Sequence, residues 1–443
     1  MYRENIDEYY GILAEHFILS NNYEKGAEYS KKAGKNAVLR PSYSDAIYYA
    51  KKCVSCLELL PKTDTIQKRI IDERTALSNY CMGINYHNEG MKAVAPIVNL
   101  TKEINYKKRL PRIYVASGTY NFIVKEDIVK GIEDLTKAKK YSEEVGDFLS
   151  LWFSCYFLGS AHWLLGEYVK SNKYLEMTLE LSRAGNNETG ICFSLCSNAV
   201  YNFIAFTGKL ELAYNLVKES IDIANKVGDI YIQQIVFSCY GSYCLAKGSF
   251  EEAETYFLKA VTLYAKTKHV VWGAWAFYWL GELYFSIRSF EKSQYYYNKA
   301  NLIIEPHKGF PSWVNLAKLK LIRAKVMQKD KDIYVESLFE YESKNKWRIY
   351  EGIIPNHIGC ILMNTDIKFI SEAEIWINKA IEANKQIGNQ LLLADDYVLY
   401  AELLQRKGTN LDAKEMLNKA VDIYQECGAD GWVERYETKL AEL

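Results

Sequence analysis

Apolar and polar residues follow a helical pattern along most of the chain, and the helical segments come in pairs. Each pair has a short turn after its first helix, and the pattern recurs about every 40 residues. It is clearest in LGSAHWLLGEYVKSNKYLEMTLEL from Leu158, YGSYCLAKGSFEEAETYFLKAVTL from Tyr240, LGELYFSIRSFEKSQYYYNKANLI from Leu280 and YAELLQRKGTNLDAKEMLNKAVDI from Tyr400. A period of this length predicts helix pairs that stack and shield each other's apolar faces.

Small residues recur at fixed places in these four segments. The first helix carries one at Gly159, Gly241, Gly281 or Ala401, and the predicted turn follows at Gly166, Gly248, Arg288 or Gly408. The second helix carries small pairs, such as Ala253 with Ala260, Ser293 with Ala300, and Ala413 with Ala420. Small side chains let two helices approach closely, so each pair is expected to pack tightly.

The predicted turns keep one phase at positions 126, 166, 208, 248, 288, 368 and 408, with one unit missing near 328. The segment SWVNLAKLKLIRAKVMQKDKDIYVESLFEYE fits that gap as a degenerate pair. Many second helices end in a glycine that suits a left-handed helix stop, at Gly146, Gly228, Gly388 and Gly428. An irregular bundle with accidental spacing is the alternative to a repeat.

We therefore predict an all-α fold, a right-handed α-solenoid of about ten to eleven helix pairs. Degenerate helices are expected over residues 1–110, regular repeats over 111–305, and C-terminal repeats with the degenerate unit over 306–443. At the start of the chain, a helix through Leu19 is expected to break at Asn21 and Asn22. A second turn is expected at Pro41 and Ser42.

The repeats resemble tetratricopeptide (TPR) repeats. The N-terminal run AEHF, NNYEKGAEYSKKAGKNA and SYSDAIYYAKKCVSCLELLP also resembles the start of the TPR region in bacterial multidomain signalling proteins. In those proteins a class III adenylate or guanylate cyclase, or a protein kinase, precedes an AAA/STAND-type ATPase, and the repeats follow. The resemblance implies a regulatory portion of such a signalling protein, or a free-standing relative.

Composition narrows the possible partners. Lys and Arg number 55 and Asp and Glu number 55, so no net charge attracts nucleic acid. No secretory signal and no run of eighteen apolar residues is evident, which predicts a cytoplasmic protein without a membrane partner. The ten cysteines then read as buried apolar residues.

No motif for catalysis, metal or cofactor stands out. The GK pairs at Gly34 and Gly208 lack the remainder of a phosphate-binding loop, and no HExxH or GxSxG segment occurs. The CxxC at Cys53 and Cys56 lies in an amphipathic helix without a second pair at zinc spacing. We expect no enzyme activity, no cofactor and no metal.

The concave groove is the expected site for a protein or peptide partner, because the first helices of stacked pairs line it. Asparagines there could bond a peptide backbone, and aromatic residues could anchor side chains. The TPR resemblance assigns these groove positions: Phe153, Tyr156, Trp163, Asn198, Asn202, Phe206, Ser238, Ser242, Trp275, Tyr278, Glu282 and Phe285. No run of lysines and arginines is evident on this face.

Three functions follow from these expectations. The first is a non-enzymatic interaction and regulatory module of a signalling protein, whose partner could be an upstream ATPase or cyclase domain of the same protein. The second is a free-standing peptide-sensing adaptor. The third, from another class, is an enzyme with an active centre in the groove, which would need a cluster of acid, base or metal groups.

Overall fold

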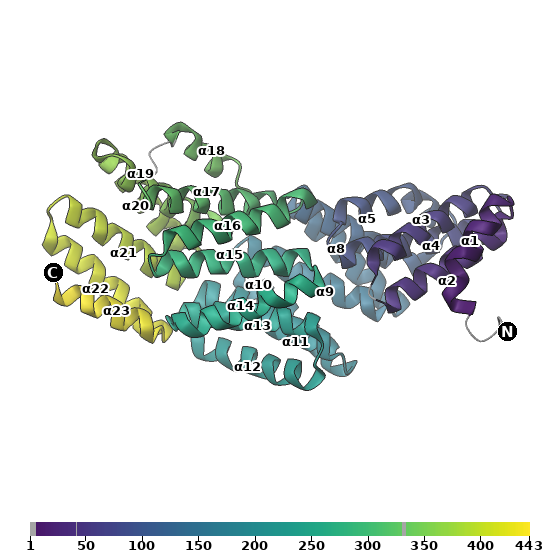
Figure 1. Ribbon diagram of the computed structural model, residues 1–443, viewed down its shortest axis with the longest axis horizontal. Helices are drawn as coiled ribbons and strands as arrows, with labels where there is room; N and C mark the ends of the chain where they lie inside the picture. Colours follow the sequence, from purple (N-terminus) through teal and green to yellow (C-terminus); the bar gives the residue numbers. More distant parts are fainter. Residues whose placement is uncertain (1–5, 41, 330–333) are drawn as a thin grey trace. The chain divides into compact units, whose positions relative to one another are not determined.

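The computed structural model describes residues 6–40, 42–329 and 334–443, and throughout this part of the chain the secondary structure is helical, without strands. Most helices pack against the next one in the sequence, and the two run in roughly opposite directions (Figure 1). This arrangement is the predicted all-α stack of helix pairs. The chain divides into two compact units, Met1–Leu158 and Gly159–Leu443, which we call unit 1 and unit 2.

Unit 1 holds the less regular helices. The predicted break near Asn21 is confirmed, because α1 ends at Leu19 and α2 begins at Tyr23. The turn expected at Pro41 lies outside the described residues. The helices of this unit are α1 (Tyr10–Leu19), α2 (Tyr23–Leu39), α3 (Tyr43–Glu58), α4 (Asp64–Gly83), α5 (His87–Val94), α6 (Val98–Glu103), α7 (Leu110–Thr119), η4 (Tyr120–Val124) and α8 (Ile128–Val145).

Unit 2 holds the regular repeats, and α9 (Phe148–Leu164) crosses from one unit into the other. Its first helices are α11 (Glu188–Asn198) with η5 (Ala199–Thr207), α13 (Ile230–Lys247), α15 (Val270–Ser286), α17 (Pro311–Met327), α19 (Ile353–Thr365) and α21 (Gln390–Arg406). Its second helices are α10 (Tyr168–Ala184), α12 (Leu210–Val227), α14 (Phe250–Thr267), α16 (Phe290–Ile304), α18 (Leu338–Ser343), α20 (Ile370–Ile387) and α22 (Asn410–Cys427), and α23 (Asp430–Ala441) follows.

Six of the seven predicted turns lie where the sequence places them. Left-handed backbone occurs at Glu126 (φ 52°), Gly166 (φ 69°), Gly208 (φ 62°), Gly248 (φ 84°), Arg288 (φ 61°) and Gly408 (φ 78°). Lys329 (φ 64°) supplies the turn that was missing near 328. At 368 the chain instead passes through the short helix η9 (Ile367–Phe369).

Helix ends show a second series of left-handed residues. Gly146, Gly228, Gly388 and Gly428 cap their helices in this conformation, as predicted. Lys268 occupies the equivalent place after α14, and Lys308 follows the short helix η6 (Glu305–His307) that extends α16, with φ of 53° at both. A lysine gives no sequence signal for such a stop, because side chains with a Cβ rarely adopt it.

Close contact between the two helices of a pair explains the small residues of the first helix. A Cβ placed on Gly281 would lie 2.6 Å from the ring of Tyr297, and one on Gly241 would lie 2.7 Å from Phe257. Both rings are completely buried. Each first helix therefore leaves room for a large side chain of the second, and a larger residue at either glycine would push the helices apart.

The degenerate unit is real but incomplete. Its first helix α17 has 17 residues, whereas its second helix α18 has only 6. The segment that joins them includes residues outside the described part. A second helix this short contains few of the positions that define the repeat, so the sequence pattern is weak in this unit.

One helix of unit 2 bears on the expectation that the protein has no membrane partner. The continuous helix Glu188–Thr207 is long and apolar enough to span a membrane by length and composition. However, 67% of its apolar window is buried inside the protein, as in the core helix of a folded domain. Its residues Cys196 and Ala199 are completely buried in the main core of unit 2.

Unit 2 coils so that late repeats contact the turns of early ones. A Cβ on Gly208 would lie 2.2 Å from Sγ of Cys427, and one on Gly166 would lie 3.5 Å from Cγ2 of Ile387. In both cases the contact joins residues about 220 positions apart, or about five and a half repeats. Helix α21 also packs against η5. Successive turns of the coil therefore touch.

This coil contact predicts different costs for two glycine substitutions. Gly228 and Gly208 both have positive φ, but nothing lies within 4 Å of a Cβ on Gly228. Gly228→Ala should lower the free energy of unfolding by about 1–2 kcal/mol, from backbone strain alone. Gly208→Ala should cost about 1–3 kcal/mol more, because its methyl group clashes with Cys427. Equal losses in urea denaturation would show that the coil contact is absent in solution.

Candidate binding surface

The first helices of unit 2 form the inside of its curve. They pack on one another as well as on their own partners, through the contacts α11–α13, α13–α15, α17–α19 and α19–α21. Closer spacing of the first helices than of the second ones places them on the inner side. We call the side chains that α15, α17, α19 and α21 present there the inner surface.

A chain of aromatic rings crosses the inner surface. Trp275 and Trp279 of α15 have ring centroids 5.7 Å apart, and Trp313 of α17 lies 5.8 Å from Trp275. Tyr278 contacts Trp279 at 5.5 Å and Trp313 at 6.0 Å. The rings are tilted or edge-on to one another, the geometry that aromatic pairs prefer.

Four indole N–H groups in and beside this chain of rings are buried and have no acceptor among the described residues, namely those of Trp275, Trp279, Trp313 and Trp347. Trp347 joins the others through Phe310, whose ring lies 6.2 Å from Trp347 and 6.0 Å from Trp313. Buried donors in folded proteins are nearly always paired, with protein groups or with ordered water. Carbonyl oxygens of a bound chain or ordered water would supply the missing acceptors.

A buried charged cluster adjoins the aromatic rings. Glu282 of α15 accepts a hydrogen bond from Lys320 at 2.5 Å, and it lies 3.4 Å from Arg323, both on α17. The hydroxyl of Tyr297 also donates to Glu282. Lys320 lies over the ring of Tyr278 at 4.8 Å, which joins the two groups of side chains into one surface.

The cluster keeps its charges in spite of burial. Burial alone would raise the pKa of Glu282, but Lys320 and Arg323 outweigh it and hold the pKa below its ordinary value. Burial lowers the pKa of Lys320 to about 8, although Glu282 works in the opposite direction. Glu282 thus stays ionised and holds both cations, which leaves the cluster with one more positive than negative charge.

His357 of α19 completes the cluster as a neutral group. Its Nδ1 lies 3.1 Å from Nη1 of Arg323, so it accepts a hydrogen bond from the guanidinium. Burial, followed by the charges of Arg323 and Lys320, holds its pKa well below the ordinary value. Nε2 of His357 and Nε of Arg323 are buried and lack partners. The N–H groups at these two atoms can therefore each donate one more hydrogen bond.

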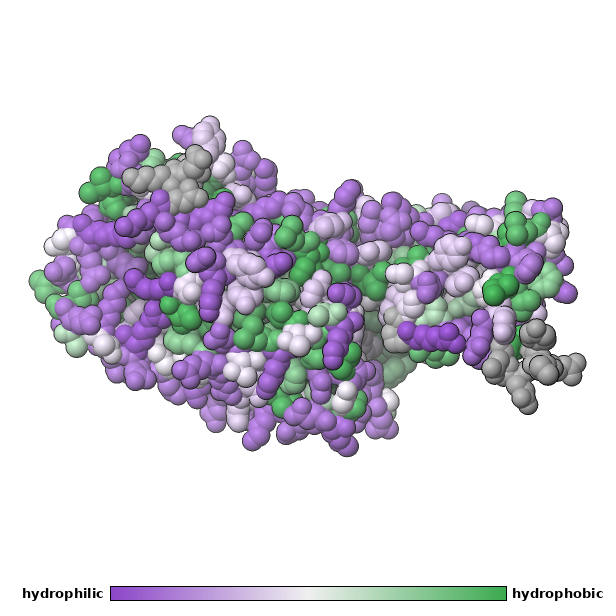
Figure 2. Space-filling model, viewed as in Figure 1, coloured by the Kyte–Doolittle hydropathy of each residue, from purple (hydrophilic) through white to green (hydrophobic). Residues whose placement is uncertain are grey.

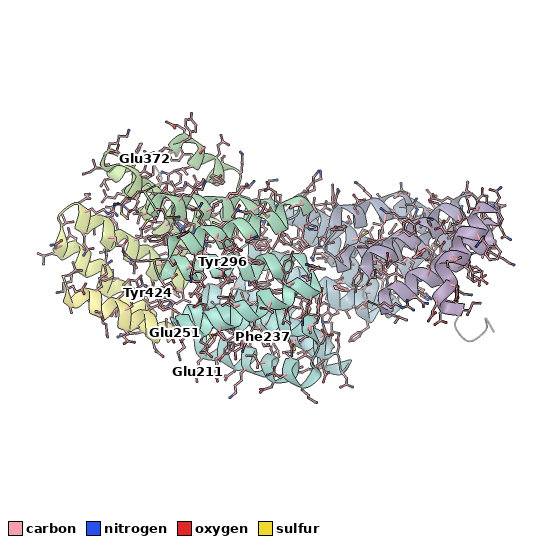
Figure 3. All side chains as sticks on the ribbon, in the orientation of Figure 1. Glu211, Phe237, Glu251, Tyr296, Glu372 and Tyr424 are labelled. Atoms are coloured by element: carbon pink, nitrogen blue, oxygen red, sulfur yellow. The ribbon has the colours of Figure 1, made fainter. Side chains whose placement is uncertain are left out.

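Helix α21 brings acidic groups to the same surface. Asp395 is exposed to solvent, yet the helices around it raise the pKa of its carboxyl group to about 6, mainly through desolvation. Tyr424 of α22 donates a hydrogen bond to it. Figure 3 shows Tyr424 where α22 lies beside α23. Asp396 is buried and accepts from Asn356 and Asn384 at 2.7 Å each, a structural role.

The structure brings together the predicted residues of α15. Tyr278 and Glu282 contribute to the inner surface, and Trp275 anchors its aromatic part. Phe285 has the guanidinium of Arg323 stacked over its ring at 3.6 Å. These four are the part of the predicted site that the structure organises around charged and aromatic neighbours.

The other predicted residues lie elsewhere, and most are committed to packing. Asn202 is completely buried and donates to Asn198 at 2.8 Å, while Ser238 and Ser242 bond carbonyls of their own helix. Phe206 is buried. Trp163 stacks on Tyr201 at 4.2 Å, and Phe153 and Tyr156 lie among the rings of α9, with Trp152 5.2 Å from each.

Lys320, Arg323 and His357 are not among the groove residues predicted from the sequence. The expectation was only that no run of lysines and arginines lines this face, and Lys320 with Arg323 adds two cations to it. They lie in the degenerate unit, where the repeat register could not be read. The motif KLKLIR of α17 places two cations three residues apart on one helix face, and that spacing was the only available signal.

A second concave feature is less suited to binding. A shallow depression of about 480 Å³ lies on α13 and α14 and is lined by Phe237, Thr255, Leu258, Lys259, Thr262 and Leu263. Figure 3 places Phe237 there, and Figure 2 shows hydrophobic residues interspersed with hydrophilic ones in this part of unit 2. It has one charged residue and no convergent polar groups.

Groups that could hold a metal ion are not formed in the described part of the chain, where no three His, Cys, Asp or Glu side chains converge. The ten cysteines are buried free thiols. Burial raises the pKa of several, including that of Cys360 beside the inner surface to about 11. A protonated buried thiol is a poor nucleophile.

Comparison with known proteins gives a fold likeness only. No protein-family model and no curated protein matches the chain. A STAND-type ATPase with a TPR sensor from Pyrococcus horikoshii is 16% identical over 90% of this chain and 54% of its own, with a TM-score of 0.36. This chain thus spans about half of that protein's length.

Two other solved structures match this chain over nearly the whole length of both proteins. A Rap protein in complex with Competence and Sporulation Factor is 12% identical over 97% of this chain and 99% of its own, with a TM-score of 0.38. The apo form of RapI is 12% identical over 90% and 98%, with a TM-score of 0.36. At such TM-scores the likeness supports no argument about function.

The lowered pKa of Lys320 predicts a stability that rises with pH. Between its folded value of about 8 and its ordinary value of 10.5, the unfolded chain binds more protons at this residue. Raising the pH from 8 to 10 should therefore increase the free energy of unfolding by about 2 kcal/mol relative to Lys320→Met. Urea titrations of both proteins at each pH measure this difference. Parallel pH profiles would contradict it.

Proposed function

We propose that this chain is a non-enzymatic binding module that takes a protein or peptide segment on the inner surface of unit 2. The observation that carries the proposal is the row of buried, unpaired indole N–H groups beside the cluster of Glu282, Lys320 and Arg323. Such a row offers donors for backbone carbonyls and ring faces for apolar side chains. Aromatic and arginine residues in this arrangement are typical of binding hot spots.

An active centre is less well supported by the same geometry. A general base needs a free lone pair near its substrate, but Glu282 is occupied by Lys320, Arg323 and Tyr297. His357 accepts from Arg323 through Nδ1, so its remaining nitrogen carries the proton. Both groups are therefore arranged to hold charges in place rather than to move protons.

The biological setting is proposed from the sequence resemblance. We place the module in the cytoplasm as a regulatory part of a signalling protein. Its partner would be a protein or peptide, including an ATPase or cyclase domain of the same protein, with neither nucleic acid nor membrane. Binding would bias an active or inactive arrangement of the signalling protein by differing affinity for the two.

Peptide selection on the intact chain tests the proposed surface. A displayed library of random peptides is selected on the wild-type protein, and the affinity of the recovered peptides is measured by fluorescence anisotropy. Trp275→Ala and Phe285→Ala should each weaken binding about tenfold or more, because they remove ring surface from the centre of the site. Tyr295→Ala is the matched control, since Tyr295 is 55% exposed on α16.

Two outcomes would count against the proposal. Recovered peptides that bind all three variants as tightly as wild type would place binding elsewhere. Hydrolysis of a nucleotide by the purified chain would favour the enzyme hypothesis.

A further inference from the structure

The last helix of the chain reaches across the coil of unit 2 to an earlier repeat. Nε1 of Trp432 in α23 donates to the carbonyl of Leu245, at the end of α13, at 3.0 Å. Nη1 of Arg435 donates to the carbonyl of Ser286, at the end of α15, at 2.8 Å. The N-terminal end of α23 lies beside the start of α14 in Figure 1.

This contact depends on two glycines. A Cβ on Gly431 would lie 2.5 Å from the carbonyl oxygen of Gly248, and one on Gly248 would lie 2.7 Å from the backbone of Gly431. The two backbones thus touch, which no other residue would permit. Around them, the ring of Trp432 meets Phe250 edge-on at 5.0 Å, and Lys247 lies 3.3 Å from Asp430.

The contact closes the coil, and Trp432, Val433, Tyr436 and Leu440 of α23 pack on the core while staying only partly buried. None of the residues of α23 is buried, whereas α22 buries Ala413, Leu417, Ala420, Val421, Tyr424 and Cys427. Detachment of α23 would therefore expose Tyr424, on which Trp432 and Tyr436 stack, and leave the other buried residues of α22 in place. Elements with few buried residues are those that open most easily in native proteins.

Helix α23 also adjoins the inner surface. The ring of Tyr436 stacks on Tyr424 at 5.7 Å, and Tyr424 donates to Asp395. Lys439 lies 2.8 Å from Glu402 of α21. Detachment of α23 would uncover the buried ring of Tyr424 beside Asp395, and would separate the two turns of the coil that it joins.

We propose that α23 is a latch that docks on the ends of α13 and α15 and closes unit 2 over its inner surface, and that its release admits the partner. The occupant of the docking surface is thus a segment of this chain itself. The part of the inference that concerns partner entry rests on the proposed function. The latch itself does not.

Hydrogen exchange on the intact chain tests the latch without any partner. Gly431→Ala should speed exchange in Asp430–Ala441 and around Gly248 at least tenfold, because its methyl group meets the Gly248 carbonyl. Helices α10, α12 and α20 should be unchanged. Thr438→Ala is the control, since exposed Thr438 bonds only within its own helix. Unchanged exchange at both segments would overturn the latch.

A second variant covers the case in which Gly431→Ala disturbs the whole of unit 2. Arg435→Gln removes the bond to Ser286 and leaves the glycine contact, so it should speed exchange in the same two segments by a smaller factor. Faster exchange throughout unit 2 in this variant as well would show that α23 is part of the core, and would overturn the latch.

A reversible cross-link tests partner entry. Lys247→Cys with Asp430→Cys places two exposed thiols at the contact, and the ten native cysteines are buried, so oxidised glutathione acts on the new pair. The oxidised protein should associate with the selected peptides at least tenfold more slowly, and a reductant should restore the rate. Equal rates would overturn the gating role and leave peptide binding intact.

The two proposals fail separately. If no selected peptide binds even the reduced protein, the proposed function fails, and hydrogen exchange still decides whether α23 is a latch.

Discussion

Close contact between the two helices of each pair is the constraint on which the remaining structure depends. A glycine or alanine in the first helix leaves room for one large side chain of the second, as Gly281 does for Tyr297. Because the helices then meet at a fixed distance, each pair stacks on the next with the same small rotation. The same contact also builds the candidate site. Tyr297, held against Gly281, directs its hydroxyl group to Glu282, and Glu282 in turn holds Lys320 and Arg323.

The charged cluster is difficult to explain by stability alone. Removing three charges from water has a large desolvation cost, which their mutual attraction offsets only when the geometry is good. Apolar residues of similar size would pack α15 against α17 at least as well. The neighbouring indole N–H groups find no acceptor among the described residues, so ordered water or a bound chain would accept from them. Both features lie on the inner side of the curve, where the proposed partner would bind.

The sequence predicted the helix pairs and their turns closely because they recur from repeat to repeat. The charged residues of the candidate site occur only once, so no repeat reveals them. Every unit repeats the small residue and the turn, so errors in one unit are corrected by the phase of the others, and even the hidden turn lies at Lys329, one residue from its expected place. Lys320, Arg323 and His357 occur once each, in units that follow the pattern poorly, and no periodicity marks them. The expectation that Asn202 faces an open groove was not met, for a related reason. Asn202 occupies a groove position by register, but the coil of unit 2 brings α21 against η5, and such contacts between distant repeats are invisible in the repeat itself.

Because successive turns of the coil touch, access of a partner to the inner surface of unit 2 depends on whether these contacts are open or closed. In an open solenoid the first helices are always accessible, and affinity depends only on the contacts that a partner makes. Here Gly208, Gly248 and Ser286 contact residues of α22 and α23, so a partner that needs more room must compete with those contacts. Its apparent affinity is then the intrinsic affinity multiplied by the fraction of molecules that are open. Because the residues of α23 are exposed or only partly buried, we expect small changes in α23 to alter that fraction more than the stability of the repeats. In a closed coil of this kind, the stability of the repeats and the accessibility of their inner surface depend on different contacts. The repeats are stabilised by their buried residues, whereas accessibility depends on the contacts of α23.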